Sequence, residues 1–346
     1  MSKQLQVNIH GPGDVRVDRV EEPTPGPRDA VVRVAACGIC GSDLGYVRLG
    51  GLMGPTGSPM PIGHELSGVV EAVGDEVTGI KVGTRVVVDP QGGANQIGNG
   101  GSEGAFTPRL LVRNAAVGES LIPIPGDLSF EMAALAEPLG VGMRAVNQSR
   151  ARPGERAVVF GAGPIGLAAV ATLRYRGVED VVSVDYSDTR LAVAERLGAG
   201  ATLNPSRDDV AARLRELHGT SPVMGAPMTG SDVYIEASGA APVLPQIIEG
   251  AKRGARITVV ALYREAISIN FLLVMMKELE LRGSIAQPDD WNDMLTMLSE
   301  VDLSPMITHR FDLASFGEAL AVAQDPEAGA KVMVACGEAS STAPVV

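Results

Sequence analysis

The segment VVFGAGPIGLAAV, residues 158–170, places three glycines in Gly-x-Gly-x-x-Gly spacing. The glycines follow an apolar run typical of a buried strand and open a stretch with helical spacing. There the first glycine allows a tight turn, the second lets the backbone approach a pyrophosphate, and the third lets helix and strand pack closely. The alternative is a glycine-rich turn that binds nothing. The context favours a dinucleotide site, whose candidate residues are Gly161, Gly163, Pro164, Ile165 and Gly166.

The strand after this motif ends in VDYSD, with Asp185 nineteen residues after Gly166. A carboxylate at this position accepts hydrogen bonds from the adenosine ribose hydroxyls and repels a 2′-phosphate. We therefore expect NAD(H) rather than NADP(H). Arg190 is a further candidate cofactor-binding residue that could weaken this preference, although arginines early in a helix are mostly solvated.

Repeated strand–helix units follow the glycine motif and predict an α/β fold with a doubly wound parallel sheet. The chain before about residue 130 instead alternates apolar and polar positions between Gly and Pro turns, which is typical of short strands in a barrel or sandwich. A strand, a short helix and another strand follow the α/β part. We predict a β-rich domain over residues 1–139 and 294–346, interrupted by an α/β dinucleotide domain over residues 140–293.

The formal net charge is −12, and the 29 basic residues are nowhere clustered. We therefore expect neither nucleic acid nor an anionic membrane as a partner. The N-terminal segment lacks the apolar core of a signal peptide, and no apolar run reaches the roughly 18 residues that a membrane-spanning helix needs. Three cysteines cannot all pair as disulfides and suit a reducing compartment. We expect a soluble, cytoplasmic protein.

Cys37 and Cys40 form a Cys-x-x-Cys pair in AACGICGSDLG. Such a pair can be half of a zinc site, a redox dithiol or two unrelated buried thiols. His64 and Glu65 alone would most often be a surface pair, but Cys40 upstream and Glu137 in ALAEPLG change that expectation. One thiolate, one imidazole and one or two carboxylates form a catalytic zinc set with an open position. A structural zinc site would need four closed ligands, typically cysteines, which three cysteines cannot supply.

Seven motifs resemble those of the zinc-dependent medium-chain alcohol and polyol dehydrogenase family, in the same order: CGICGSD, GHELSGVVEAVG, GTRVVV, AEPLGVGMRAV, GAGPIGLAAV, YIEASGA and ELELRGS. The match runs nearly end to end. It is nearest to the sorbitol, butanediol and threonine dehydrogenase branch, because AEPL stands where simple alcohol dehydrogenases usually have a cysteine. The resemblance implies a GroES-like catalytic domain and a Rossmann coenzyme domain. It also implies one catalytic Zn²⁺ per chain, NAD(H), and reversible oxidation of a secondary alcohol, polyol or vicinal diol to a ketone.

The resemblance further implies roles for single residues. The implied zinc ligands are Cys40, His64, Glu65 and Glu137, the last directly or through water. Ser42 would hydrogen-bond the substrate hydroxyl and begin its proton path, Asp43 would orient His64, and Lys331 would face the cofactor pyrophosphate. In the implied mechanism zinc lowers the pKa of a bound alcohol, Ser42 helps to remove its proton, and the alkoxide passes hydride to C4 of the nicotinamide. The implied catalytic residues are thus Ser42, Cys40, His64 and Glu65.

Two positions depart from the family pattern. Gly45 stands where a histidine commonly passes the proton to solvent, so the exit route must use cofactor ribose, water or another group. The segment QGGANQIGNGGSEGAF, residues 91–106, holds no cysteine where many relatives bind a structural zinc, and we expect no such zinc. Cys37 is expected to be an inert thiol that closes a buried strand.

Two other functions fit the same fold: a zinc-free reductase of quinones or enoyl groups, and a non-catalytic NAD-binding protein. The first would not need the zinc ligands, and the second would show no turnover. The Met and Leu stripe in FLLVMMKELELRGSIA, residues 271–286, predicts a core helix and an edge strand. Relatives commonly pair that strand across a two-fold axis, which implies a homodimer or homotetramer. The small-molecule alcohol or ketone should contact residues 46–60, the chain near residue 106 and residues 263–273.

Overall fold

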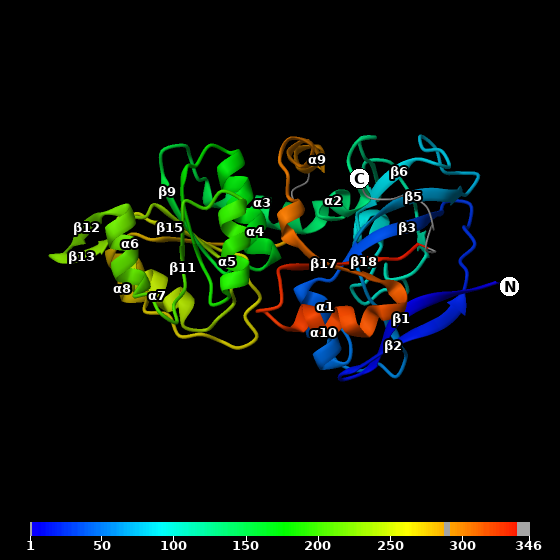
Figure 1. Ribbon diagram of the computed structural model, residues 1–346, viewed down its shortest axis with the longest axis horizontal. Coiled ribbons are helices and arrows are strands. Elements are labelled where there is room, and N and C mark those ends of the chain that lie inside the picture. Colours follow the sequence, from blue (N-terminus) through cyan, green and yellow to red (C-terminus); the bar gives the residue numbers. More distant parts are fainter. Residues whose placement is uncertain (1, 287–290, 338–346) are drawn as a thin grey trace.

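The computed structural model describes residues 2–286 and 291–337 of the chain. Ten strands form its β-rich part: β1 (Lys3–Gly11), β2 (Asp14–Glu21), β3 (Ala30–Gly38), β4 (Met60–Pro61), β5 (Glu65–Val73), β6 (Arg85–Val88), β7 (Arg109–Val112), β8 (Leu121–Pro123), β17 (Ile307–Asp312) and β18 (Lys331–Ala335). One sheet has the order β17-β18-β3-β5-β6-β8, with β7 also paired to β3, and a smaller sheet has the order β2-β1-β4. The predicted β-rich architecture is confirmed (Figure 1).

A six-stranded sheet forms the second part of the molecule. Its strands are β9 (Arg156–Phe160), β10 (Asp180–Val184), β11 (Ala201–Leu203), β14 (Val233–Glu236), β15 (Arg256–Val259) and β16 (Glu280–Gly283). Every ladder between them is parallel, and their order is β11-β10-β9-β14-β15-β16. This is the predicted doubly wound order, in which the chain starts in the middle and winds to both edges. A hairpin of β12 (Thr220–Val223) and β13 (Ala226–Thr229) extends from this part at the left of Figure 1.

The described helices are α1 (Gly41–Leu49), α2 (Phe130–Ala134), α3 (Ala136–Ser149), α4 (Pro164–Tyr175), α5 (Asp188–Arg196), α6 (Val210–His218), α7 (Val243–Gly250), α8 (Phe271–Met276), α9 (Trp291–Glu300) and α10 (Phe316–Gln324), with 3-10 turns η1 (Gly92–Ala94), η2 (Ser304–Met306) and η3 (Leu313–Ser315). Over residues 2–286 and 291–337, none of them combines the length and apolar character needed to cross a bilayer. The helices α3 and α4 approach closely because α3 has Gly142, where a Cβ would lie 2.6 Å from that of Ala168.

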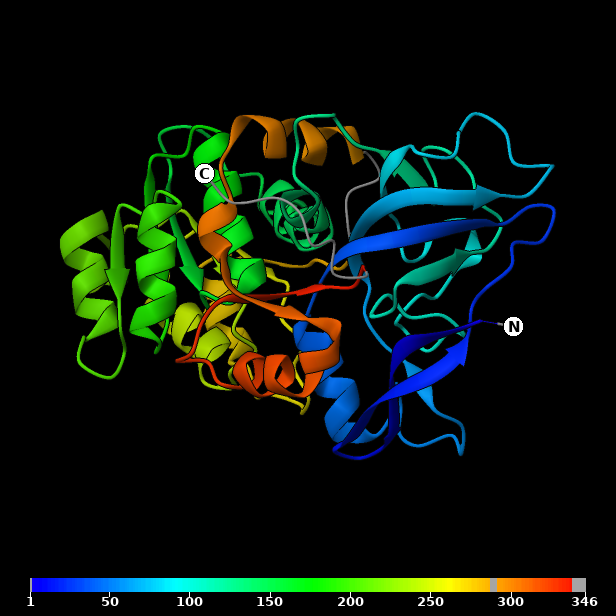
Figure 2. The same ribbon diagram turned by 45° about the vertical axis from the view of Figure 1, so that its right-hand side comes forward.

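The C-terminal strands return to the sheet in which the chain began. β18 pairs antiparallel with β3 and parallel with β17, and both views show these orange and red strands beside blue β3 (Figures 1 and 2). A continuous apolar core also joins the two parts, since Ala36 of β3 and Met333 of β18 belong to the same cluster as Val159 of β9. The boundaries 139/140 and 293/294 stay a prediction. Residues 287–290 and 338–346 of the predicted domains lie outside the described residues.

The predicted helix after Ser129 is present but interrupted. The Ser129 hydroxyl accepts the backbone N–H of Met132, which confirms it as the N-cap. The helix breaks at Leu135, between α2 and α3. Pro138 explains the break, because its ring would collide with the carbonyl of Ala134 in a continuous helix. The break places Glu137 in the first turn of a new helix.

The prediction of a core helix at residues 271–276 is wrong. α8 has no buried residue, and Phe271 and Met275 are 68% and 64% exposed. Leu273 and Val274 pack partly against the apolar cluster of the parallel sheet, but no element among the described residues buries Phe271, Leu272 or Met275. The other half of the prediction is confirmed, because β16 is the edge strand of the parallel sheet.

Candidate metal centre and cofactor site

Local capping chemistry positions Cys40. The residue is the N-cap of α1, and its Sγ accepts the backbone N–H of Ser42 at 3.5 Å. Asp43, at the third helical position, accepts the backbone N–H of Cys40 at 2.9 Å, which completes a capping box. The thiol is therefore fixed at the turn between β3 and α1 and stays partly exposed, whereas Cys37 is fully buried in β3, as predicted.

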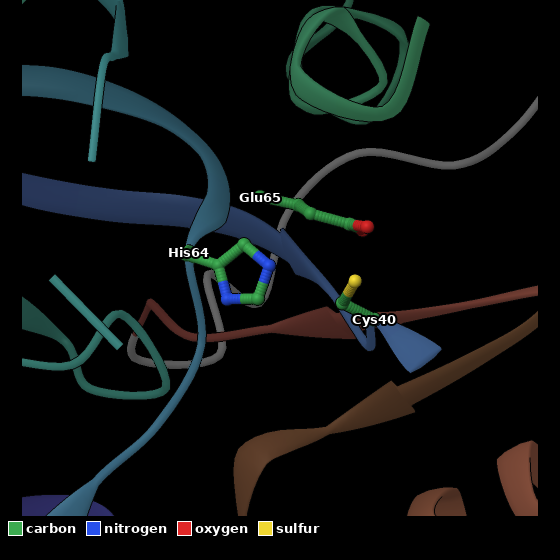
Figure 3. A group of neighbouring side chains, drawn as sticks. All are labelled: Cys40, His64 and Glu65. Carbon is green, nitrogen blue, oxygen red and sulfur yellow. The ribbon is translucent and has the colours of Figure 1, made fainter. Parts of the chain in front are cut away.

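Cys40, His64 and Glu65 form the one group of three potential metal ligands found in the described part of the chain. Their ligand atoms all lie within 4.8 Å of one another. Figure 3 shows the three side chains pointing toward a common space. His64 and Glu65 are almost completely buried, at the turn into β5. A thiolate, an imidazole and a carboxylate fit Zn²⁺, and three protein ligands leave a position for a substrate oxygen.

Asp43 and Ser42 flank the imidazole of His64 on opposite sides. The Asp43 Oδ1 lies 3.6 Å from Nδ1, and the Ser42 Oγ lies 3.4 Å from Nε2. Burial lowers the pKa of His64, but the charges of Asp43 and Cys40 outweigh it and hold that pKa well above its usual value in the metal-free protein. A metal ion would therefore displace a proton from His64 on binding.

Lys331 lies at the metal centre, contrary to the expectation that it faces the pyrophosphate. Its Nζ donates to both carboxylate oxygens of Glu65, at 2.8 and 2.5 Å, and to the carbonyl of Ile39 at 3.0 Å. Lys331 and Glu65 are 0% and 1% exposed. The ammonium is thus committed to a candidate ligand and to the backbone beside Cys40. A buried carboxylate needs such a partner, which explains the placement.

Gly38 makes room for this ion pair. It pairs with Glu65 in one ladder and with Met333 in another. A Cβ on Gly38 would lie 2.3 Å from Oε2 of Glu65 and 3.4 Å from Cδ of Lys331. A side chain at residue 38 would therefore push the carboxylate away from the lysine. The sequence analysis missed this glycine, whose signal is its position at the end of a strand two residues before the candidate ligand Cys40.

Glu137 lies outside the group of three but close to it. It is buried in the first turn of α3, and burial together with the charge of Glu65 raises its pKa to about 7 against the opposing charges of His64 and Lys331. A carboxyl group with that pKa can be neutral or charged near neutral pH. Its role as a zinc ligand, direct or through water, stays a prediction.

The glycine motif forms the predicted cradle at the start of α4. Gly161 has φ +93°, and a Cβ there would lie 2.8 Å from the carbonyl carbon of Ala237. A Cβ on Gly166 would lie 1.7 Å from the carbonyl oxygen of Gly161, so only glycine allows the helix to pack on this turn. A Cβ on Gly163 would meet nothing within 4 Å. This open space at a helix N-terminus, before Pro164 and Ile165 of α4, fits a pyrophosphate.

Asp185 is held against the glycine loop. Its Oδ2 accepts the backbone N–H of Ala162 at 2.6 Å, and its Oδ1 accepts that of Ser187 at 2.8 Å. A cavity of about 540 Å³ is lined in part by Phe160 and Tyr186, the neighbours of Gly161 and Asp185 in the chain. Asp185 itself does not line this cavity, and its contact with the adenosine ribose stays a prediction.

Among the described residues, no hydrogen bond or ion pair joins the Arg190 guanidinium to the carboxylate of Asp185. Its Nε donates to the carbonyl of Gly329, in the segment before β18, at 3.0 Å. The arginine thus ties α5 to the segment before β18 and is not the simply solvated side chain of the alternative interpretation. Its predicted role in cofactor binding stays a prediction.

A β-rich domain with a buried Cys–His–Glu group, packed against a doubly wound domain with an anion cradle, defines a two-domain metal-dependent dehydrogenase. Family models support this class: the alcohol dehydrogenase GroES-like domain matches residues 26–125, and the zinc-binding dehydrogenase domain matches residues 164–300. The chain belongs to the zinc-dependent medium-chain dehydrogenase family, as the resemblance implied.

Similar proteins cover nearly the whole chain. A (R,R)-butanediol dehydrogenase from Neisseria gonorrhoeae is 35% identical over 88% of this chain and 91% of its own length. A sorbitol dehydrogenase from Macaca fascicularis is 32% identical over 96% of both chains. The crystal structure of 2R,3R-butanediol dehydrogenase from Bacillus subtilis, 30% identical, superimposes with a TM-score of 0.83 over 96% of this chain and 99% of that chain. A zinc-binding dehydrogenase structure from Sinorhizobium meliloti, bound to NADP and 27% identical, covers 97% of this chain and 100% of its own with the same TM-score.

Proposed function

We propose that this protein is a zinc- and NAD-dependent dehydrogenase that reversibly oxidises a secondary alcohol, a polyol or a vicinal diol, to a ketone. The observation that carries the proposal is the Cys40–His64–Glu65 group, whose ligand atoms all lie within 4.8 Å of one another. A quinone or enoyl reductase of this fold would have no use for it. The sorbitol and butanediol dehydrogenases among the relatives support the substrate class.

The chain's own residues divide the work of the reaction. Cys40, His64 and Glu65 would hold the zinc ion, which when bound acts as a Lewis acid toward the substrate oxygen, while the nicotinamide accepts the hydride. Asp43 keeps the His64 ring oriented, with Nε2 toward Ser42. The Ser42 hydroxyl stands beside this nitrogen and is placed to accept the proton of the substrate hydroxyl.

The proton's exit past Gly45 runs through Tyr46 in this proposal. Tyr46 lies on α1 with Ser42, and its hydroxyl donates to Oδ1 of Asn99 at 3.1 Å. Burial and the charges of Asp43 and Cys40 raise the pKa of Tyr46. The phenol therefore stays protonated at neutral pH, and it would pass a proton on by exchanging hydrogen bonds and not by ionising.

Zinc analysis and a substrate screen test the proposal together. Purified protein should contain about one zinc per chain. It should reduce NAD with at least one member of a panel of polyols, vicinal diols and cyclic secondary alcohols, and a chelator should abolish that activity. Zinc-free protein that reduces an enone would instead support the reductase. Tight NADH binding without turnover of any alcohol or ketone would support a non-catalytic protein.

Asp185 should set the preference for NAD over NADP. We expect Asp185→Asn to lower kcat/KM for NAD by about tenfold to a hundredfold, because hydrogen bonds to a charged acceptor are worth roughly 1.5–3 kcal/mol. The same variant should use NADP better, since the repelling charge is gone. Steady-state kinetics with both cofactors measure the ratio. Asp188→Asn, in the first turn of α5, is the matched control and should leave it unchanged. A wild-type enzyme that prefers NADP would contradict the assignment.

The exposed apolar face around α8 supports the proposed oligomer. Large apolar side chains on α8, in the loop before it and just after the edge strand β16 have exposed fractions of 58–75%: Leu262, Phe271, Leu272, Met275 and Ile285. An open sheet edge beside such a face is the surface that a second copy would cover. We propose a homodimer or homotetramer that forms through this edge of the sheet. We also propose that the protein is cytoplasmic.

Charge on this face should separate the subunits. We expect the double variant Phe271→Glu/Met275→Glu to reduce the sedimentation mass from a dimer or tetramer toward a single chain, because two buried, unpaired charges oppose association. Met224→Glu, on the hairpin between β12 and β13 and 83% exposed, should leave the mass unchanged. A wild-type mass of one chain at micromolar concentration would refute the oligomer.

A further inference from the structure

Arg264, a charged residue of the cofactor domain, lies beside Gly45 of α1 in the β-rich domain. A Cβ built on Gly45 would lie 4.0 Å from Nη2 of Arg264, and no other atom lies as near apart from its own helix and chain neighbours. Arg264 belongs to the loop between β15 and α8, within the segment predicted to contact substrate. In Figures 1 and 2 this yellow loop extends toward α1 and α10. The position where the family resemblance implies a proton-relaying histidine thus borders a guanidinium.

The same helix presents Ser42 to the metal centre. On an α-helix, side chains three residues apart are neighbours, with Cβ atoms about 5–6 Å apart. Ser42 and Gly45 of α1 have this spacing, so the Arg264 guanidinium lies within about 10 Å of the Cβ of Ser42, whose hydroxyl stands beside His64. That separation is short enough for one substrate molecule to contact both groups.

Arg264 has no internal partner for its charge. No hydrogen bond or ion pair joins its side chain to another residue within 2–286 or 291–337, and the side chain is exposed. A guanidinium is charged at every physiological pH and matches a carboxylate or phosphate with paired N–H donors. It cannot relay a proton by titrating. Its suitable role beside an alcohol site is to bind an oxyanion.

The neighbouring residue fixes the base of the arginine. The Tyr263 hydroxyl is buried, and its ring packs against the apolar cluster of the parallel sheet. Burial and the charge of the fully buried Glu236, at the end of β14, raise the pKa of this phenol. The carboxylate of Glu236 in turn accepts the backbone N–H groups of Ser238 at 2.8 Å and Gly239 at 3.0 Å. With Tyr263 held inward, the side chain of Arg264 is directed outward, over Gly45.

We propose that the natural substrate is an anionic polyol, a hydroxylated carbon chain that carries a carboxylate or phosphate group bound by Arg264. This inference rests on the proposed dehydrogenase function and names its substrate class. The buried carboxylates of Asp43, Glu65 and Glu137 surround the reacting centre, in a chain of net charge −12, and an anion approaching it meets a negative field. The guanidinium supplies the opposite charge on the substrate side. The cofactor pyrophosphate belongs elsewhere, at the N-terminus of α4 in the Gly163 cradle.

Matched neutral and anionic substrates test this proposal on the zinc-loaded enzyme with NAD. We expect kcat/KM for gluconate or for sorbitol 6-phosphate to exceed that for sorbitol. Arg264→Gln should lower the preferred anion's kcat/KM by about tenfold to a hundredfold, the worth of a charged hydrogen bond, with little change for sorbitol. Arg264→Lys should recover part of the loss. Comparing the two anions shows which group Arg264 binds. A site for phosphate would favour sorbitol 6-phosphate, and a site for carboxylate would favour gluconate.

A variant that leaves Arg264 intact provides a second test. Gly45→Asp would place a carboxylate beside the guanidinium and should lower kcat/KM for the anionic substrate, as Arg264→Gln does. Gly45→Ala adds only the methyl group that the structure accommodates and should keep the ratio of anionic to neutral activity. Gly is unfavourable within helices, so neither change is expected to unfold α1.

Measurements of binding and of turnover distinguish a failure of the anionic-substrate proposal from a failure of the proposed dehydrogenase function. Calorimetry of gluconate and sorbitol 6-phosphate with the zinc- and NADH-loaded enzyme needs no catalysis, and absence of binding by both would overturn the anionic substrate. Equal kcat/KM for sorbitol and the anions, unaffected by Arg264→Gln, would overturn it while leaving the dehydrogenase intact. A loss of NADH affinity in Arg264→Gln without a change in anion preference would assign the arginine to the cofactor instead. No turnover of any alcohol, neutral or anionic, would overturn the proposed function itself.

Discussion

Replacing Cys40 by alanine is expected to remove bound zinc and to lower kcat/KM by about a thousandfold or more. Cys40 supplies the thiolate of the only Cys–His–Glu group found within the described residues, and two remaining ligands cannot hold the ion tightly. Without the ion, the several kcal/mol of charge stabilisation that a Lewis acid provides are lost, and each 1.4 kcal/mol is about a factor of ten in rate. Elemental analysis and NAD-coupled kinetics measure the two effects.

Cys37→Ala is the matched control for this variant. Cys37 is fully buried three residues earlier in the apolar core of the β-rich part, and its Sγ donates to the carbonyl of Gly38 at 3.8 Å. Burial raises its pKa, so the thiol stays neutral. The control should keep its zinc and its kcat and lose only about 1 kcal/mol of stability. Full activity in Cys40→Ala would remove the basis of the proposed function.

Replacing Lys331 by methionine is expected to destabilise the zinc-free protein by about 3–5 kcal/mol, because a fully buried Glu65 carboxylate would lose its countercharge. Zinc affinity should also fall by about tenfold to a hundredfold, the usual effect of removing a group that orients a metal ligand. Thermal unfolding of the zinc-free protein and competitive zinc titration measure these changes. The double variant Lys331→Met/Glu65→Gln should recover much of the stability but not the zinc affinity.

Lys277 offers a matched control for a buried lysine far from the metal centre. Its Nζ donates to the carbonyls of Ile248 at 2.9 Å and Glu249 at 2.6 Å, at the end of α7. Lys277→Met should lower stability and leave zinc affinity unchanged. Equal effects of the two variants on zinc affinity would show that Lys331 acts on global stability and does not orient Glu65.

The fold could be predicted from the sequence wherever a local pattern decides the structure. The glycine motif lies between β9 and α4, and Asp185 follows the next strand, because tight turns and buried parallel strands leave strong marks in sequence. The sequence prediction has one helix after Ser129 and lacks the break at Leu135, although Pro138 is a helix-breaking residue at that place. The stripe of α8 was assigned to the core because apolar periodicity cannot say whether the chain itself or a second copy covers it.

The sequence predicts which residues form the candidate metal site, but it does not predict which residues from distant segments contact them. Cys40, His64 and Glu65 lie within 25 positions of one another and meet as expected. Lys331 was assigned to the pyrophosphate, and nothing local to its strand reveals Glu65 as its partner, 266 residues away. Arg264 and Gly45 likewise meet across two domains. Contacts between distant segments depend on how the sheets assemble, which a single sequence does not display.

The antiparallel pairing of β18 with β3 has a consequence for the order of assembly on the ribosome. All three candidate ligands have emerged when a small fraction of the chain is made, yet the sheet that carries them closes only with residues 331–335, near its end. The cofactor domain lies wholly between and can fold first, as domains generally do during synthesis. Until residues 331–335 have been made, the nascent chain would therefore hold the thiol, imidazole and carboxylate without Lys331, and metal loading of the completed site follows that step.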